Sequence, residues 1–165
     1  MRYEVTQSQI QYFETHDTIL FEDFFSKEES ALFQKFSFGY DLWRTHPEIK
    51  KMSCNKELGE IIFQLTSIKP VRLLFDRIVE TETIDLTSSS FQGILASVLV
   101  SSHGIEIFSN KIPIHAKERS LLIVYGTIDA VFKFVEHDPF ATFIKKQGYA
   151  YGDPLKSDDY PLIYR

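Results

Sequence analysis

Histidines are the side chains of this sequence best suited to bind a metal ion, and their positions limit where such a site can lie. His103 and His115 fall among the β-rich runs of the later half of the chain, where a barrel interior could hold a ligand. His16, His46 and His137 lie at predicted turns, where solvated or capping roles are expected. No His-Glu-x-x-His pair is present, which excludes a zinc protease of that class. His103 and His115 are therefore the candidate imidazole ligands.

Cys54 is the only thiol in the chain. A single cysteine excludes an internal disulfide and any zinc site built on two thiolates, and it favours a reducing compartment, so we expect a cytoplasmic protein. A helix start next to Cys54 could lower the pKa of the thiol, although a buried, unreactive cysteine is the expectation. The seven glycines form neither a P-loop nor a dinucleotide-binding pattern, and no Gly-x-Ser-x-Gly occurs. Phosphate cradling and serine hydrolase chemistry are therefore not expected.

Neither a nucleic acid nor a membrane is an expected partner of this chain. The chain has 23 acidic residues against 18 Lys and Arg, and its basic residues come at most in pairs. The apolar run at 94–100 is far too short to cross a bilayer, and the first residues have no signal-peptide pattern. A metal-dependent DNA-binding regulator is the least favoured class, because the two early predicted helices are too far apart for a helix-turn-helix motif.

With 165 residues and no linker or repeat, we expect one domain over residues 1–165.

Helix signals dominate residues 1–68. Thr6 to Gln9 and Ser26 to Glu29 both fit capping boxes, which predict helices near 7–15 and from 27 onward, the second with Ala31, Leu32, Phe33 and Phe36 inward and ended by Gly39. A short strand is predicted at 18–21, and residues 40–47 are expected to be irregular. Asn55 predicts the start of another helix. Its apolar positions follow the helical period and are Leu58, Ile61, Ile62 and Leu65.

Strand signals dominate residues 69–165. Short β-rich runs at 71–76, 94–100, 105–108, 111–114, 121–125 and 131–135 favour a sandwich or jelly roll over a parallel α/β sheet. A late helix near 139–147 is predicted from Asp138-Pro139 at its start and Gly148 just past its end. The turn-rich tail is expected on the surface of the sheet. Its tyrosines could form a partner surface and are Tyr149, Tyr151, Tyr160 and Tyr164.

Four segments carry a family likeness, namely ILFEDFFSKEESALFQKF, LTSIKPVRLLFDRIVE, ERSLLIVYG and FIKKQGYAYGDPLKSDDYPLIYR. Together they resemble the phytanoyl-CoA dioxygenase-like branch of the non-haem Fe(II) and 2-oxoglutarate-dependent oxygenases. The resemblance implies an α+β chain with a double-stranded β-helix (jelly roll, cupin-like) at 69–165 and N-terminal helices packed on it. It also implies Fe(II) held by His-x-Asp and a distal His, with a later Arg that pairs with the 2-oxoglutarate carboxylate. A two-His, one-carboxylate triad leaves positions open for cosubstrate and oxygen.

The family pattern is incomplete in this sequence. Asp76 matches the carboxylate, but Leu74 stands at the first His position and cannot bind a metal. If Arg119 is the family's Arg, the distal His falls near Ser109, where no histidine occurs. Asp76 could otherwise form a surface ion pair with a neighbouring Arg of its strand, and Arg119 could be an ordinary strand-edge charge.

We therefore predict a non-catalytic or divergent protein that binds an unknown small molecule or protein, without a cofactor. Arg119, Arg72 and Asp76 are the predicted ligand-binding residues. The alternative is an active Fe(II)/2-oxoglutarate oxygenase or other metalloenzyme with a rearranged site of Asp76, His103 and His115. The sequence leaves the oligomeric state open.

Overall fold

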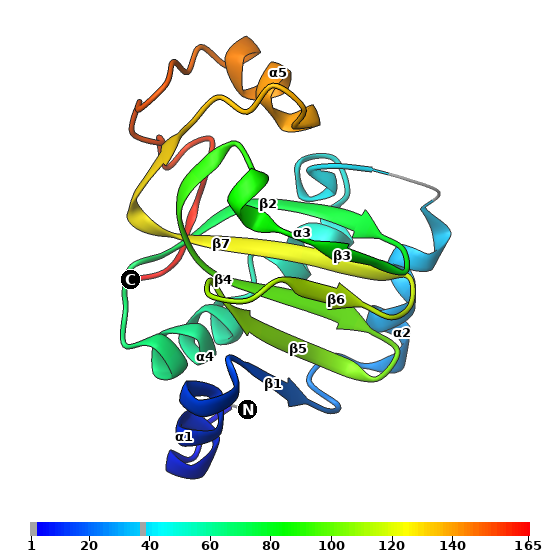
Figure 1. Cartoon of the computed structure of the whole chain (residues 1–165). Coiled ribbons are helices and arrows are strands. Elements are labelled where there is room, and N and C mark those ends of the chain that lie inside the picture. The colour runs from blue at the N-terminus through cyan, green and yellow to red at the C-terminus, as the bar shows by residue number, and fades with distance from the viewer. Residues whose placement is uncertain (1–2, 37–38) are drawn as a thin grey trace.

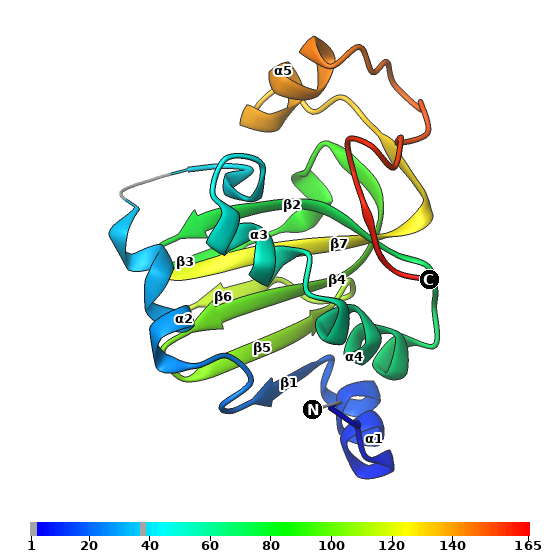
Figure 2. The same ribbon diagram turned by 180° about the vertical axis from the view of Figure 1, so that it is seen from behind.

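The computed structural model describes residues 3–36 and 39–165, and it places a layer of helices behind a curled antiparallel sheet (Figures 1 and 2). The helices are α1 (Gln7–His16), α2 (Lys27–Ala31), α3 (Pro47–Ser53), α4 (Lys56–Thr66) and α5 (Pro139–Lys146), with short 3-10 turns η1 (Leu32–Lys35), η2 (Leu42–Arg44) and η3 (Leu86–Ser88). None of the helices in the described part of the chain is long and apolar enough to cross a membrane.

Two sheets form the β layer. The larger sheet has the order β1-β5-β4-β7-β2-β8, and β3 and β6 form a separate two-stranded sheet that lies over one face of the larger one (Figure 1). The strands are β1 (Thr18–Phe21), β2 (Val71–Val79), β3 (Glu82–Ile84), β4 (Phe91–Ser101), β5 (Gly104–Ser109), β6 (Ile114–Ala116), β7 (Ser120–Phe132) and β8 (Leu162–Tyr164). Every pairing between these strands is antiparallel, which confirms the predicted jelly-roll class.

The larger sheet is apolar on both faces, so the molecule has two cores. One face packs on α4 through its buried stripe, which the helical period of the sequence predicted correctly. The other face packs on the two-stranded sheet and on α5, and the space between the sheets is filled by buried apolar side chains. Those from the larger sheet include Leu74, Phe75, Leu99, Phe108, Leu122 and Val124.

Both predicted capping boxes are present, and α1, α4 and α5 begin at the predicted caps. The second helix is shorter than predicted: α2 ends at Ala31 and tightens into η1, so Gly39 does not terminate it. Of its predicted inward residues, Phe33 is buried whereas Ala31 is exposed. The missed helix α3 begins with Pro47 at its first position, a helix-start signal inside the segment expected to be irregular.

Three predictions for the second half of the chain are wrong. Residues 111–113 form a turn, and the strand begins only at Ile114. Residues 131–132 are the end of the long β7 rather than a separate strand. The tail does not lie on the sheet surface, because β8 pairs with β2 as an edge strand and Tyr149 and Tyr160 are buried in the second core. Tyr151 is exposed, as a partner surface would require.

Candidate functional site: the jelly-roll interior and its rim

A β-bulge in β2 decides where Asp76 points. Leu73 pairs with Tyr125 of β7, but the next pair is Phe75 with Val124, so Leu74 is an extra residue in the strand. In an unbroken strand, residues 74 and 76 would share the face toward the two-stranded sheet. The bulge keeps Leu74 in the core between the sheets but turns Asp76 toward the helices. The two residues that match the family's His-x-Asp therefore face opposite sides.

Asp76 is completely buried and is held by the helical layer. The Ser53 hydroxyl donates to its Oδ2 at 2.6 Å, and the Trp43 backbone N–H donates to the same oxygen at 3.2 Å. No basic side chain forms an ion pair with it among the described residues, so the alternative of a surface ion pair with Arg72 or Arg77 of its strand is wrong. Burial raises the pKa of Asp76 to about 7, an effect that the Ser53 hydrogen bond opposes and the nearby Asp41 carboxylate reinforces.

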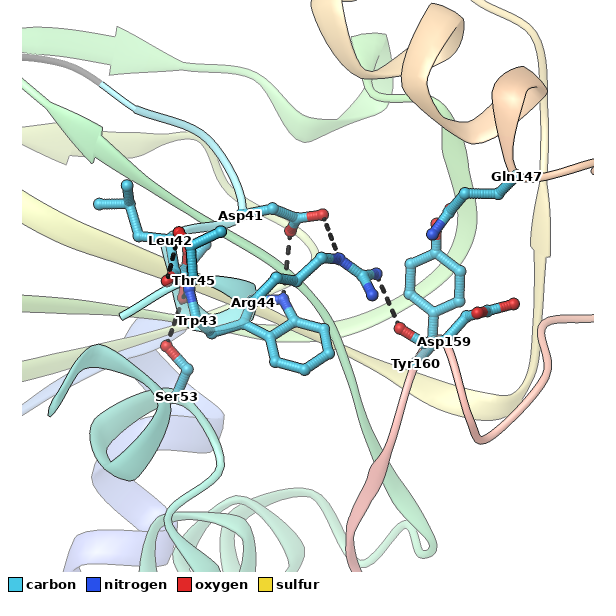
Figure 3. A network of polar contacts seen from close by, with 10 residues as sticks. Asp41, Leu42, Trp43, Arg44, Thr45, Ser53, Gln147, Asp159 and Tyr160 are labelled. Atoms are coloured by element: carbon cyan, nitrogen blue, oxygen red, sulfur yellow. Dashed lines mark hydrogen bonds and ion pairs between the residues drawn. The ribbon is translucent and has the colours of Figure 1, made fainter. Parts of the chain in front are cut away.

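Asp41 and Arg44 extend this buried network toward the C-terminal tail. Arg44 Nε pairs with Asp41 Oδ2 at 2.9 Å, and its Nη2 donates to the backbone carbonyl of Asp159 at 2.7 Å (Figure 3). Burial raises the pKa of Asp41, which Arg44 partly offsets. Behind Asp76, the Tyr125 hydroxyl donates to the Ser53 carbonyl at 2.8 Å. The network fastens η2, α3 and the tail to the sheet, which is a structural role.

Cys54 lies beside this network and is half-buried. Burial raises the pKa of its thiol, an effect that the Lys50 charge opposes. A raised pKa keeps the thiol protonated, which disfavours a nucleophilic role and agrees with the expectation of an unreactive cysteine.

Arg72 lies on the opposite face of β2 from Asp76. Its side chain is buried, and Nη1 donates to the Tyr160 carbonyl at 2.7 Å, which holds the tail against the sheet. Its Nε has no hydrogen-bond partner among the described residues. Arg72 pairs with Gly126, near the middle of β7, whereas Arg119 directly precedes the first residue of that strand. The structure therefore does not bring Arg72, Asp76 and Arg119 into one pocket.

Arg119 stands at the start of a late strand, as the family likeness implies. Its Nη1 forms an ion pair with Glu80 at 3.3 Å, rather than with its neighbour Glu118. Nε and Nη2 are buried and have no hydrogen-bond partner among the described residues. Two unsatisfied guanidinium donors in a side chain that is 24% exposed suit an acidic group.

His103 and His115 line the same cavity, a pocket of about 450 Å³ that we call the rim pocket. It exists because the two-stranded sheet covers only part of the larger one, leaving a row of paired residues, Leu20, Glu106 and Leu99, at its floor. The full lining is Leu20, Leu99, Ser101, His103, Glu106, His115, Lys117, Glu118 and Ser120. Glu106 was not among the predicted site residues. A charged residue inside the apolar run 105–108 nevertheless indicates that one face of this strand is not covered by another layer.

The described residues that line the rim pocket form neither a three-ligand metal cluster nor a hydrolase relay. His103 Nδ1 contacts both Glu118 Oε1 at 3.0 Å and Ser102 Oγ at 3.2 Å, whereas a Ser-His-acid relay needs serine and carboxylate on different ring nitrogens. His115 Nδ1 contacts the Thr83 hydroxyl at 3.0 Å. Within residues 3–36 and 39–165, no three His, Cys, Asp or Glu side chains are grouped to hold a metal. Asp76 does not join the two histidines.

Ser109, at the position expected for the distal His, also has another role. Its hydroxyl donates to Asp17 Oδ1 at 2.8 Å and so ties the end of β5 to the turn after α1. With Leu74 in the core, Asp76 on the helix side and Ser109 bonded to Asp17, the residues at these three positions do not fit Fe(II).

Comparison with known proteins supports the fold but gives no family by sequence. No family model matches the chain, and no curated protein sequence matches it significantly. Among solved structures, the non-heme alpha ketoglutarate dependent carbocyclase SnoK from nogalamycin biosynthesis matches with a TM-score of 0.72 at 12% identity, over 95% of this chain and 96% of that one. CT296 from Chlamydia trachomatis matches with a TM-score of 0.57 at 20% identity, over 76% of this chain and 97% of that one. The chain thus shares the jelly-roll fold of SnoK.

Proposed function

We propose that this chain is a divergent, non-catalytic binding protein built on the oxygenase fold, and that its ligand binds outside the space between the sheets. The observation that carries the proposal is the bulge at Leu74 in β2. The apolar Leu74 side chain lies between the sheets, whereas Asp76, at the position of the family's carboxylate, faces the helices. The buried apolar side chains that fill this space together with Leu74 include Phe75, Phe108 and Leu122, each at most 4% exposed. A charged cosubstrate and a hydrated metal ion would have to displace this packing.

Arg119 remains a candidate contact for an acidic group of the ligand or partner. Of the three residues predicted to bind ligand, it is the one that combines unsatisfied donors with partial exposure. Asp76 Oδ2 already accepts hydrogen bonds from the Ser53 hydroxyl and the Trp43 backbone N–H, and Arg72 is buried under the tail.

Anaerobic Fe(II) titration in the presence of 2-oxoglutarate, followed by exposure to oxygen, tests this function. The expected result is no saturable Fe(II) binding at micromolar concentration and no succinate above a protein-free control. Stoichiometric Fe(II) binding with succinate formation would overturn the proposal and favour the active oxygenase. Fe(II) binding that is lost in both His103→Ala and His115→Ala would favour a rearranged metalloenzyme at the rim pocket.

A further inference from the structure

A second cavity lies at the other end of the two-stranded sheet formed by β3 and β6, and we call it the lysine pocket. It has a volume of about 490 Å³, within the range of small-molecule sites. Its walls come from three places along the chain: residues 85–87 after β3, residues 91–94 at the start of β4, and the loop 110–113 before β6. Lys133, just past β7, completes the lining.

The charges of this pocket favour an anion. Lys111 and Lys133 face it with a single carboxylate, Asp85, in a chain whose formal net charge is −5. The Asp85 carboxylate already accepts hydrogen bonds from the backbone N–H and the hydroxyl of Thr87 at 3.0 and 2.7 Å. The rim pocket has the opposite balance, with Glu106 and Glu118 against one lysine. Of the two large cavities, the lysine pocket is the one suited to negative charge.

Several polar groups of the lysine pocket are fixed before any ligand arrives. Lys133 Nζ donates to the Thr87 carbonyl at 2.9 Å, and Asn110 Nδ2 donates to the Ile94 carbonyl at 3.0 Å. Each of these nitrogens keeps further N–H donors. The Lys111 ammonium forms no hydrogen bond or ion pair with the described residues. The site therefore offers donors held in place plus one mobile cation, which lowers the entropic cost of binding an acceptor group.

The remaining wall of the pocket is apolar and large enough for a ring. Phe91 is buried at its base, and Leu86, Ile94 and Ile112 are half-buried around it. Apolar surface next to fixed donors is the usual composition of a small-molecule site. A wholly polar anion would leave this surface unused, and a neutral apolar compound would leave the two ammonium groups unused.

We propose that the lysine pocket binds an amphipathic organic anion, a molecule with a ring-sized apolar body and one carboxylate, sulfonate or phosphate group. The proposal rests on the proposed function, since it names the ligand class of a binding protein whose inter-sheet space is closed. Lys111 and Lys133 bind the acidic group, and Phe91 with Ile94 and Ile112 contacts the apolar body.

Fluorescence titration with 8-anilinonaphthalene-1-sulfonate, an aromatic sulfonate, tests the proposal on the full chain. N-phenyl-1-naphthylamine has a similar apolar body without the charge and serves as the neutral probe. The variant Lys111→Met with Lys133→Met keeps the aliphatic stems and removes both charges. We expect its dissociation constant for the sulfonate to rise at least fivefold, with a change of less than twofold for the neutral probe. The double Lys→Arg variant should restore sulfonate binding.

Lys117→Met is the matched control, because Lys117 is an exposed lysine that lines the rim pocket. It should bind the sulfonate as the wild type does. The proposal is overturned if the wild type does not bind the sulfonate, if the Lys111 and Lys133 double variant binds it unchanged, or if Lys117→Met weakens it as much. An equal loss for the neutral probe would also overturn it, because the effect would then not depend on charge. None of these results depends on Fe(II) or succinate, so failure here is distinguishable from failure of the proposed function.

Discussion

The Ser53 hydroxyl lies 2.6 Å from the Asp76 carboxylate, and this hydrogen bond joins the last residue of α3 to β2, next to the edge strand of the larger sheet. Among the described residues, the carboxylate has no cationic partner. A hydroxyl and a backbone N–H replace the water that solvates it in the unfolded chain, and they stabilise its charge less than an arginine would.

Asp76→Asn should change how the stability of the protein depends on pH. Burial raises the pKa of Asp76 from 3.8 to about 7, so the native state holds this proton more tightly than the unfolded chain. The stabilising contribution is full below pH 4 and is lost as the pH rises to about 7, by at most about 4 kcal/mol. Urea unfolding at pH 5 and pH 8 should show that wild type loses more stability than Asp76→Asn over this interval. Asp85→Asn, at an exposed acid, should keep the wild-type slope; equal slopes for wild type and Asp76→Asn would contradict the prediction.

Ser53→Ala removes the stronger of the two donors to Asp76. We expect a loss of about 1.5–3 kcal/mol at pH 8, where the carboxylate is ionised, and a smaller loss at pH 5. The same change should raise the pKa of Asp76 further, because the lost bond favours the charged form. NMR titration of the Asp76 carboxyl carbon measures this shift. In the Asp76→Asn background, Ser53→Ala should lose its pH dependence; an unchanged pH effect there would assign it to another group.

Leu74→His supplies the missing imidazole at the first family position, yet it should not create an iron site. The bulge keeps residue 74 between the sheets and Asp76 behind them, so the two side chains cannot reach one ion. We expect a stability loss of about 2–5 kcal/mol from a polar ring in a packed core, and no gain in Fe(II) affinity. Leu74→Ala provides the matched loss of packing without a ligand. Fe(II) binding by the histidine variant alone would show that β2 can straighten.

Gly104→Ala should destabilise the hairpin that carries His103. Gly104 has a φ of +131°, and an added Cβ would clash with the Phe21 carbonyl oxygen of β1. Both the backbone and the neighbouring strand oppose the substitution, so we expect a loss of at least about 2 kcal/mol. Gly148→Ala is the control, because it also has a positive φ (+96°) but open space around it, and it should cost about 1 kcal/mol. Thermal unfolding of both variants makes the comparison; equal losses would mean that the contact with β1 does not matter.

Local signals predicted the starts of α1, α4 and α5, because helix caps and helical apolar stripes depend on residues that are neighbours in the sequence. The Thr6 and Ser26 capping boxes and the stripe through Leu58 and Leu65 needed no tertiary information. The jelly-roll class was likewise predictable from short strands and turns.

The candidate site was much less predictable, because it depends on strand register. Asp76 matches a family carboxylate by position, but its direction is set by the pairing of Phe75 with Val124, a contact between residues far apart in the sequence. The same holds for the rim pocket, where His103 and His115 were identified but their companions Glu106 and Glu118 were not. The lysine pocket combines four separate segments, none of which has a recognisable motif.

The bulge in β2 also fixes the direction of every residue that follows it in the strand. Because Leu74 is the extra residue, its deletion would leave Phe75 paired with Val124 and Asp76 paired with Ile123, and Asp76 would still face the helices. Asp76 would reach the inter-sheet side only if Leu74 joined the ladder and the rest of β2 slid by one residue along β7. The same slide would turn Ile78 away from the helix-side core and remove the acceptor of the Ser53 hydroxyl. The pairing register of β2, rather than the presence of an aspartate at this position, therefore decides whether the carboxylate fastens helices or faces the space between the sheets.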